Sequence, residues 1–197
     1  GYCHIPLLVM TSGNIHDEPI VIDDEDAYEK LFSVADAFLG HDRAICARYD
    51  DSVVRVINAG SAGEALQFLR RARGFAPLPV PLSLPAPASE EVSRETFVPP
   101  LSQHIGDMEN AETYDAWLQA KDRYEALFEI EPGRLACDLH PEYLTSKWAH
   151  DQSRVHGLPL TEVQHHHAHI VSVMGEHGLP GPVCGIAFDG TGYGMDG

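Results

Sequence analysis

The stretch Arg134–Gly178, "RLACDLHPEYLTSKWAHDQSRVHGLPLTEVQHHHAHIVSVMGEHG", decides the fold class. Its first part, "RLACDLHP", is short and apolar and predicts a strand, and "EYLTSKWAHDQ" predicts a helix. "LTEVQ" then predicts a second strand, and "HAHIVSVMGEHG" predicts a helix that ends at its glycine. Strands and helices that alternate in this way indicate an α/β sheet.

Histidines crowd into this stretch, since eight of the twelve in the chain lie between His140 and His177. His165 and His169 are four positions apart, so on a helix their rings project from one face and can hold one metal ion. His166 and His167 are expected to point elsewhere. Two residues of one type often occur at this spacing by chance, so an ordinary helix rich in imidazole is the alternative interpretation.

A carboxylate further along the chain favours the metal interpretation. "PVCGIAFDGTGYG", Pro182–Gly194, predicts a strand that runs into a glycine turn. Asp189 ends that strand, so its carboxylate is expected at the carboxyl edge of the sheet, where ligands of open α/β sheets gather. Two imidazoles and one carboxylate suit zinc or ferrous iron. The turn Gly190–Gly192, with Thr191 at its centre, offers backbone N–H groups to a phosphate, although it could equally be only a turn.

The segment "CDLHPEY" allows a second kind of site. Asp138 and His140 alternate along a strand and share a face, whereas Cys137 and His140 lie on opposite faces. A nucleophilic pair formed by Cys137 and His140 is therefore a weaker interpretation than a strand end followed by a His-Pro turn.

The first half of the chain has a different pattern. "IPLLVMTSGN", Ile5–Asn14, predicts a strand and a turn, and a helix with an acidic start is expected from Asp23 to Gly40. "SVVRVI" and "EALQFLRR" flank a glycine turn and favour a hairpin, although the second segment could be a helix by pattern alone. A proline-rich stretch, Ala76–Pro87, then separates this half from a helix that Asn110 can cap.

Arginines are concentrated in the first half, with six between His41 and Gly74. Ion pairs on the surface are the ordinary explanation of such a cluster. The planar fork of arginine also matches the oxygens of phosphates and carboxylates. The turns "TSGN" and "DDSVVR" add hydroxyl, amide and backbone N–H donors, so the functional interpretation is a pocket for an anion.

Composition restricts the class of protein. The chain of 197 residues has 13 basic and 30 acidic residues, and its net charge of -17 argues against diffuse binding to nucleic acid or to an anionic membrane. Four scattered cysteines without a signal segment indicate reduced thiols and a cytoplasmic location. No membrane span is expected. The chain begins without Met and stops within a glycine-rich turn, so we expect it to be part of a longer protein.

Several segments together resemble the HypF family of [NiFe]-hydrogenase maturation carbamoyltransferases. They occur in the order of the family and cover most of the chain: "LLVMTSGNIHDEPIVID", "HDRAICARYDDSVVRVI", "LRRARGFAPLPVPL", "LSQHIGDMENAETYDAW", "ACDLHPEYLTSKWA", "VQHHHAHIVSVMGEHGL" and "IAFDGTGYGMDG".

This resemblance implies a fold and a domain order. Residues 1–84 are expected to be the C-terminal part of a YrdC-like domain, whose twisted sheet belongs to a double-stranded RNA binding fold. Residues 85–95 would be a linker rich in proline and polar residues. Residues 96–197 would be the N-terminal part of a Kae1-like domain with the actin-like ATPase fold. The expected fold class is therefore α/β, or α+β.

The resemblance also implies an activity. Members of the family form carbamoyl adenylate from carbamoyl phosphate and ATP, with Mg, and pass the carbamoyl group to the C-terminal cysteine of HypE, toward the cyanide ligands of the hydrogenase iron. Zinc or iron is expected in the Kae1-like domain, and further structural zinc only in segments upstream of this chain. Despite the YrdC-like fold, no nucleic acid is expected as a partner.

Matching residues carry the family's sites onto this chain. The residues expected to bind nucleotide or carbamoyl phosphate are Ser12, Asn14, Ser52, Arg71 and Arg73. The phosphate loop is expected at Gly190, Thr191 and Gly192. The metal ligands are expected to be His165, His169 and Asp189.

The chain departs from the family pattern at one place, and two other functions stay open. Before "SQHIGD" the family usually has a strand and turn like G-x-E-L-K-N-T-F, but "ASEEVSRETFVPPLSQHIG", Ala88–Gly106, lacks the glycine and the Lys-Asn pair. A non-catalytic remnant is therefore one alternative. The other is threonylcarbamoyl transfer to tRNA, which the fused domain order and the acidic charge disfavour.

Overall fold

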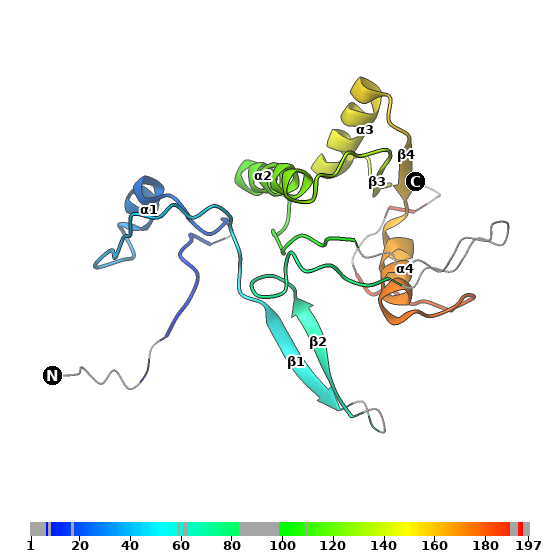
Figure 1. The fold of residues 1–197 in the computed structure, drawn as a ribbon, viewed down its shortest axis with the longest axis horizontal. Helices are drawn as coiled ribbons and strands as arrows, with labels where there is room; N and C mark the ends of the chain where they lie inside the picture. The colour runs from blue at the N-terminus through cyan, green and yellow to red at the C-terminus, as the bar shows by residue number, and fades with distance from the viewer. Residues whose placement is uncertain are drawn as a thin grey trace. The chain divides into compact units, whose positions relative to one another are not determined.

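The structure is a computed structural model that describes residues 7, 9–16, 18–58, 60, 63–82, 99–108, 110–189 and 193–194. It divides into two compact units, one of Gly1–Phe75 with Gln103–Ala120 and the other of Ala76–Ser102 with Lys121–Gly197. The described residues form helices and two small sheets, which confirms the expected mixed α/β class (Figure 1). The predicted domain boundaries at residues 84 and 95 stay predictions.

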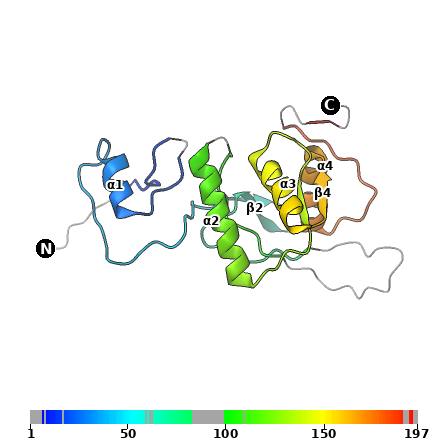
Figure 2. The same ribbon diagram turned by 90° about the horizontal axis from the view of Figure 1, so that it is seen from above.

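The second unit contains a β-α-β arrangement that the sequence predicts. Strands β3 (Leu135–Asp138) and β4 (Leu160–Val163) pair in parallel, with Asp138 opposite Val163. Parallel neighbours need a crossover connection, and α3 (Leu144–His156) supplies it and packs against both strands (Figures 1 and 2). Because the strands run the same way, both carboxyl ends lie at one edge of the sheet.

Helix α3 is tied to the end of β3. Ser146, which is 1% exposed, donates a hydrogen bond of 2.9 Å from its hydroxyl to the backbone carbonyl of Asp138. Ala149, three residues further along the helix, is also buried. The helix ends at Gly157, whose φ of 66° lies in the left-handed region that glycine tolerates. These contacts hold the carboxyl end of β3 in place.

Helix α4 (His165–His177) begins directly after β4. The side chain of Gln164 caps it by accepting a hydrogen bond of 2.8 Å from the backbone N–H of His167. The helix ends at Gly178, with φ of 60°, so the predicted glycine stop is confirmed. His165 therefore occupies the first helical position, at the carboxyl edge of the sheet.

The strand predicted within Pro182–Gly194 is wrong for its described residues. From Pro182 to Asp189 the chain has no strand, and Ile186 and Phe188 are 71% and 94% exposed. An apolar run becomes a strand only when a neighbouring strand accepts its backbone hydrogen bonds, and none of the described strands pairs with this segment. Asp189 thus follows an irregular segment rather than ending a strand.

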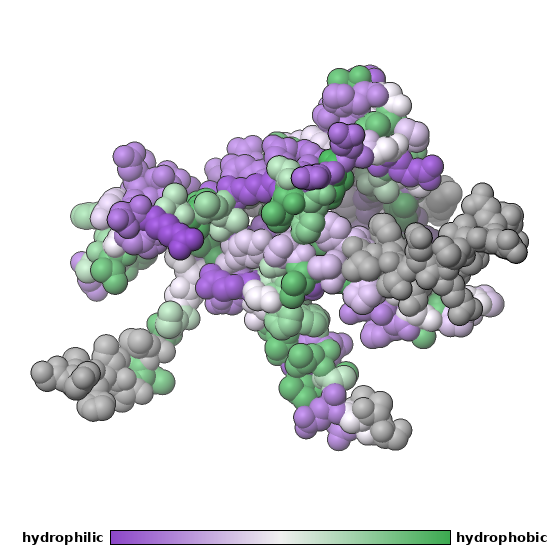
Figure 3. All heavy atoms as spheres, in the orientation of Figure 1, coloured by the Kyte–Doolittle hydropathy of each residue, from purple (hydrophilic) through white to green (hydrophobic). Residues whose placement is uncertain are grey.

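The first unit contains the hairpin that the glycine turn predicts. Strands β1 (Val53–Asn58) and β2 (Glu64–Arg70) pair in antiparallel fashion, so the strand interpretation of "EALQFLRR" is confirmed. Apolar side chains stay accessible along the hairpin, as its green surface in Figure 3 shows, and Val56 and Leu66 are 61% and 56% exposed.

Two other predictions for the first unit are wrong: the length of its helix and the strand before it. Helix α1 (Asp24–Leu31) is capped by Asp23 but ends well before Gly40. The chain continues as a turn, in which the carbonyl of Leu31 accepts the N–H groups of both Val34 and Ala35. Within Ile5–Asn14, the described residues form no strand. They lack a partner strand in the described part of the chain, so the apolar pattern alone does not produce a sheet.

The predicted cap at Asn110 is confirmed. Helix α2 (Ala111–Phe128) starts after it, and the Asn110 side chain accepts a hydrogen bond of 2.8 Å from the backbone N–H of Thr113. Among the helices that the structure describes, none combines the length and the apolar character needed to cross a membrane.

The tie between α3 and β3 gives a stability prediction. Ser146→Ala removes the donor to a partly buried carbonyl, so we expect the free energy of unfolding of the second unit to fall by about 1–3 kcal/mol. Urea unfolding can be followed through Trp148, in a Trp117→Phe background that leaves one tryptophan.

A matched control is Ser172→Ala, because the Ser172 hydroxyl donates to the carbonyl of His169 at an exposed position of α4. We expect this change to stay within about 0.5 kcal/mol. Equal losses for the two variants would contradict the anchoring role of Ser146.

Candidate functional site

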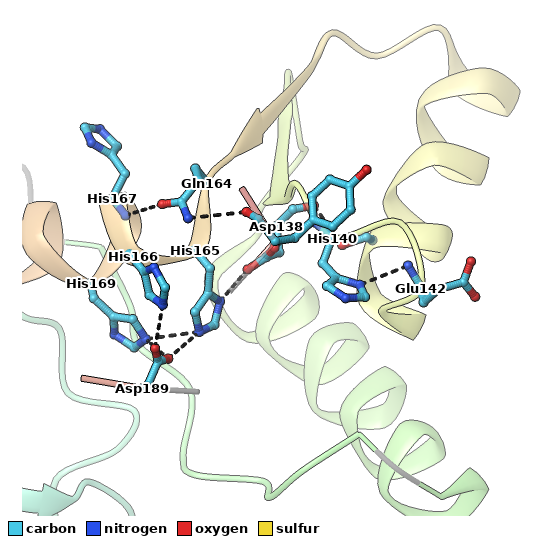
Figure 4. A network of polar contacts seen from close by, with 11 residues as sticks. Asp138, His140, Glu142, Gln164, His165, His166, His167, His169 and Asp189 are labelled. Atoms are coloured by element: carbon cyan, nitrogen blue, oxygen red, sulfur yellow. Dashed lines mark hydrogen bonds and ion pairs between the residues drawn. The ribbon is translucent and has the colours of Figure 1, made fainter. Parts of the chain in front are cut away.

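The three predicted metal ligands meet at the carboxyl edge of the β3–β4 sheet. His165 and His169 project from the first turns of α4, and Asp189 approaches them from the segment that follows the helix (Figure 4). One nitrogen or oxygen atom of each lies within 4.8 Å of the others. Among the described residues, these three form the group of His, Cys, Asp and Glu side chains that is close enough to hold an ion.

The distances show how tightly the three atoms converge. His165 Nε2 lies 2.7 Å from Asp189 Oδ2, and His169 Nε2 lies 2.9 Å from the same oxygen. The two imidazole nitrogens are 3.2 Å apart. A carboxylate oxygen and unprotonated ring nitrogens are all acceptors, so the cluster calls for a proton or a cation between them.

Charge at the site shifts two titratable groups. The hydrogen bond to Asp138 raises the pKa of His165, burial acts in the opposite direction, and the hydrogen bond to Asp189 adds to the rise. Desolvation is the largest single influence on Asp189 and acts to raise its pKa, but the hydrogen bonds from His165 and His169 together outweigh it and lower the pKa below the ordinary value. The cluster therefore favours a negative Asp189 and a positive species beside it.

The donor set fits a transition-metal ion. Ligand atoms around a tetrahedral zinc ion stand roughly 3.3 Å apart, and the three separations here are 2.7, 2.9 and 3.2 Å. Two imidazoles and a carboxylate are ligands that zinc and ferrous iron both accept. His165 and Asp189 are 31% and 43% exposed and His169 is 54% exposed, so the ligand side of the cluster is open.

The expectation that His166 points elsewhere is wrong. Its Nε2 lies 2.8 Å from Asp189 Oδ1, in ion-pair range although without hydrogen-bond geometry. Adjacent helical positions are about 100° apart, but a carboxylate has two oxygens and can face both of them. His167 does point away from the cluster, as expected (Figure 4).

Asp138 contacts the cluster from its other side. Its Oδ2 lies 2.6 Å from His165 Nδ1, while its Oδ1 accepts a hydrogen bond of 2.8 Å from the backbone N–H of His140. The Asp138 side chain is 17% exposed, which makes it the least exposed of the side chains in ion pairs with His165. The sequence contained a signal for this contact: Asp138 lies in a predicted strand, and that strand ends at Asp138 in the structure, at the carboxyl edge of the sheet.

The residues predicted to bind an anion in the first unit are partly brought together. The Ser52 hydroxyl donates to the carbonyl of Arg73 at 2.8 Å and accepts from the N–H of Ala72 at 2.9 Å. The Arg73 guanidinium donates to the carbonyl of Tyr49 at 3.0 Å and pairs with Asp51 at 3.6 Å. The Arg73 side chain is 66% exposed, so its ion pair is weak and can be replaced by another anion.

The remaining predicted residues behave differently from one another. Asn14 donates from its side chain to the carbonyls of Ile15 and Glu18, which stabilises its own turn. Ser12 is exposed. Gly190, Thr191 and Gly192 lie outside the described residues.

The cysteine alternative receives no support from the local geometry. Burial raises the pKa of the Cys137 thiol, although a hydrogen bond with Ser146 partly offsets the rise. The His140 ring instead stacks on Tyr143, with centroids 4.3 Å apart, and its Nδ1 accepts the N–H of Glu142. Cys137 therefore has the properties of a structural thiol.

Two parts of the chain are similar to two different families of protein domains. The family model described as the HypF Kae1-like domain matches residues 94–176, which include His165 and His169. The model described as telomere recombination, of the Sua5, YciO and YrdC proteins, matches residues 2–72. The carbamoyltransferase HypF of Synechocystis sp. is 43% identical over 96% of this chain. The chain is homologous to HypF carbamoyltransferases over nearly its whole length.

Solved HypF structures agree with the sequence comparison. A crystal structure of full-length HypF in the phosphate- and nucleotide-bound form has a TM-score of 0.79 and 41% identity over 94% of this chain. HypF of T. kodakarensis has a TM-score of 0.77 and 37% identity over 95% of the chain. The expected YrdC-like and Kae1-like character is thereby confirmed.

These relatives are longer than the chain. It spans 25% of the Synechocystis HypF, 30% of the full-length HypF in the crystal structure and 25% of the T. kodakarensis protein.

The raised pKa of Cys137 gives a second prediction. Because the thiolate is the reactive form, iodoacetamide at neutral pH should alkylate Cys137 more slowly than Cys46 and Cys184, which are both exposed. Mass spectrometry of timed digests measures the three rates. In denaturant the rates should become similar, and a Cys137 that reacts fastest in the folded chain would revive the nucleophile interpretation.

Proposed function

We propose that this chain contributes to a hydrogenase-maturation carbamoyltransferase, with an anion pocket in its YrdC-like part and a metal centre in its Kae1-like part. The observation that carries the proposal is the convergence of His165, His169 and Asp189, in a chain that is similar to carbamoyltransferases of the HypF family. The proposed reaction forms carbamoyl adenylate from carbamoyl phosphate and ATP, with Mg. The acceptor would be the C-terminal cysteine of a HypE-like protein.

The YrdC-like part would bind the anionic substrates. A HypF has been solved in a phosphate- and nucleotide-bound form, which supports an anion pocket in this family. In this chain Arg71 and Arg73 would supply positive charge, because a guanidinium presents paired donors to phosphate oxygens. Ser12, Asn14 and Ser52 would add neutral donors. At present Ser52 binds two backbone groups of the arginine segment, so it also sets the position of Arg73.

The Kae1-like part would hold zinc or iron through His165, His169 and Asp189. A bound divalent cation supplies positive charge that can hold the phosphate oxygens of a nucleotide. The protein's own contribution is to keep three ligand atoms within 3.2 Å of one another before an ion arrives. Gly190, Thr191 and Gly192 follow Asp189 directly in the sequence, and their backbone N–H groups would face the same phosphates.

The metal assignment predicts a loss of bound ion. His165→Ala or His169→Ala removes one of three ligands, so zinc or iron content after dialysis against each metal should fall from about one ion per chain to near zero. Elemental analysis of the desalted protein measures it.

His167→Ala is the matched control, because this neighbouring ring points away from the cluster and its backbone N–H still reaches Gln164. It should keep the full metal content. If all three variants bound metal equally, the ion would lie elsewhere and the ligand assignment would be wrong.

The anion pocket predicts a loss of turnover in the complete protein that carries this segment. Arg71→Ala and Arg73→Ala should each lower kcat/KM for carbamoyl phosphate by roughly 100-fold, because an anion would lose a fixed donor. Release of pyrophosphate or AMP that depends on carbamoyl phosphate measures the effect. Arg154→Ala, whose exposed side chain pairs with Asp151, should leave turnover unchanged. Equal turnover in all variants would remove the arginines from the pocket.

A further inference from the structure

His165 is held at both of its ring nitrogens, and the two contacts have different characters. Nε2 faces the convergence with Asp189 and His169, while Nδ1 faces Asp138 at 2.6 Å (Figure 4). The described hydrogen bonds of the His169 ring, in contrast, all use Nε2. The two imidazoles of the cluster are therefore oriented by different means.

Asp138 is itself fixed in place by three contacts. Its Oδ1 accepts the N–H of His140, its backbone carbonyl accepts the Ser146 hydroxyl, and its strand pairs with β4, which ends two residues before His165. Its side chain is only 17% exposed, so water competes little for Oδ2. A carboxylate held in this way can only accept a hydrogen bond, which requires a proton on His165 Nδ1. The Asp189 carboxylate makes the same demand of Nε2 at 2.7 Å, but its side chain is 43% exposed, so water competes with it and a cation can take the place of the proton there.

The position of that proton decides what Nε2 can do. A neutral imidazole carries one ring proton, and the hydrogen bond at one nitrogen sets which nitrogen bears it. With the proton on Nδ1, the lone pair of Nε2 points into the cluster, and the neighbouring carboxylate also makes that nitrogen a stronger ligand.

We propose that Asp138 is a positioning residue that keeps His165 in the tautomer with a proton on Nδ1 and so presents Nε2 to a divalent cation. The inference rests on the metal centre of the proposed function, which does not itself assign a role to Asp138. His169 has no such partner among its described hydrogen bonds, so Asp138 acts on the cluster through His165.

The discriminating substitution is Asp138→Asn. Asparagine keeps the shape and can still accept the N–H of His140 through its Oδ1. Its amide NH2 then faces His165 Nδ1 as a donor, which favours the tautomer with a proton on Nε2 and closes that nitrogen to a cation. A purely structural role of Asp138 would be preserved by this substitution. Asp151→Asn, the same chemical change at an exposed position of α3, is the matched control.

Two measurements on the whole chain test the inference. The first is the tautomer of His165 in the metal-free chain, read from long-range ¹⁵N–¹H correlation spectra. Because contact with Asp138 raises the pKa of His165, the pH is raised until the ring nitrogens show the neutral form. The original chain and Asp151→Asn should show protonated Nδ1, and Asp138→Asn should show protonated Nε2. His167, whose ring points away from the cluster, should not change in any variant, which makes it an internal reference (Figure 4).

The second measurement is affinity for zinc, by competition with a chromophoric chelator near neutral pH. We expect Asp138→Asn to bind zinc roughly 10–100-fold more weakly than the original chain, and Asp151→Asn to bind it equally well. Amide spectra report whether each variant keeps the fold. If Asp138→Asn does not fold, the tautomer of His165 in the original chain still tests the inference. A proton on Nε2 of His165 in the original chain overturns it, and a proton on Nδ1 supports it.

Failure of the inference and failure of the metal centre give different results. Zinc binding that Asp138→Asn leaves unchanged, with the proton still on Nδ1, overturns the role of Asp138 and keeps the metal centre. A chain that binds neither zinc nor iron overturns the metal centre, and with it the presentation of Nε2 to a cation.

Discussion

The site depends on the parallel pairing of β3 with β4. Asp138 lies opposite Val163, so the residues that follow the two strands reach the same edge of the sheet, and the Asp138 carboxylate meets the His165 ring at 2.6 Å. A shift of the register by one residue would turn the side chains of one strand to the other face. Ser146 holds the end of β3, and Gln164 holds the start of α4. The cluster is therefore positioned by backbone pairing before any ligand atom contributes.

Local patterns in the sequence predicted the elements that are stabilised locally. The helical spacing, the glycine after α4 and the cap at Asn110 all act within a few residues, and the structure confirms them. Segments whose structure depends on a distant partner were not predictable. Pro182–Asp189 has the composition of a strand, but none of the described strands pairs with it.

The candidate site shows the same division. His165 and His169 were predictable from helical spacing, and the structure brings Asp189 to them although it does not end a strand. His166 was missed because an argument from helical spacing gives the carboxylate one contact position, whereas Asp189 has two oxygens and one of them faces His166. Asp138 was considered only as a neighbour of His140, because the pairing of β3 with β4 cannot be derived from either strand alone. The nucleotide residues came from resemblance, since isolated serines and arginines have no spacing that distinguishes them from an ordinary surface.

The way Asp189 reaches α4 has a thermodynamic consequence. Asp189 lies 24 positions after His165, and the intervening chain runs the length of the helix, reverses at Gly178 and returns without forming a strand. An ion shared by the two residues would act as a cross-link that closes this loop. A covalent link around a loop of this size removes about 3 kcal/mol of chain entropy from the unfolded state, and a metal bond constrains the chain in the same sense. The returning segment then needs no regular structure of its own, because the ion it helps to bind fixes its end.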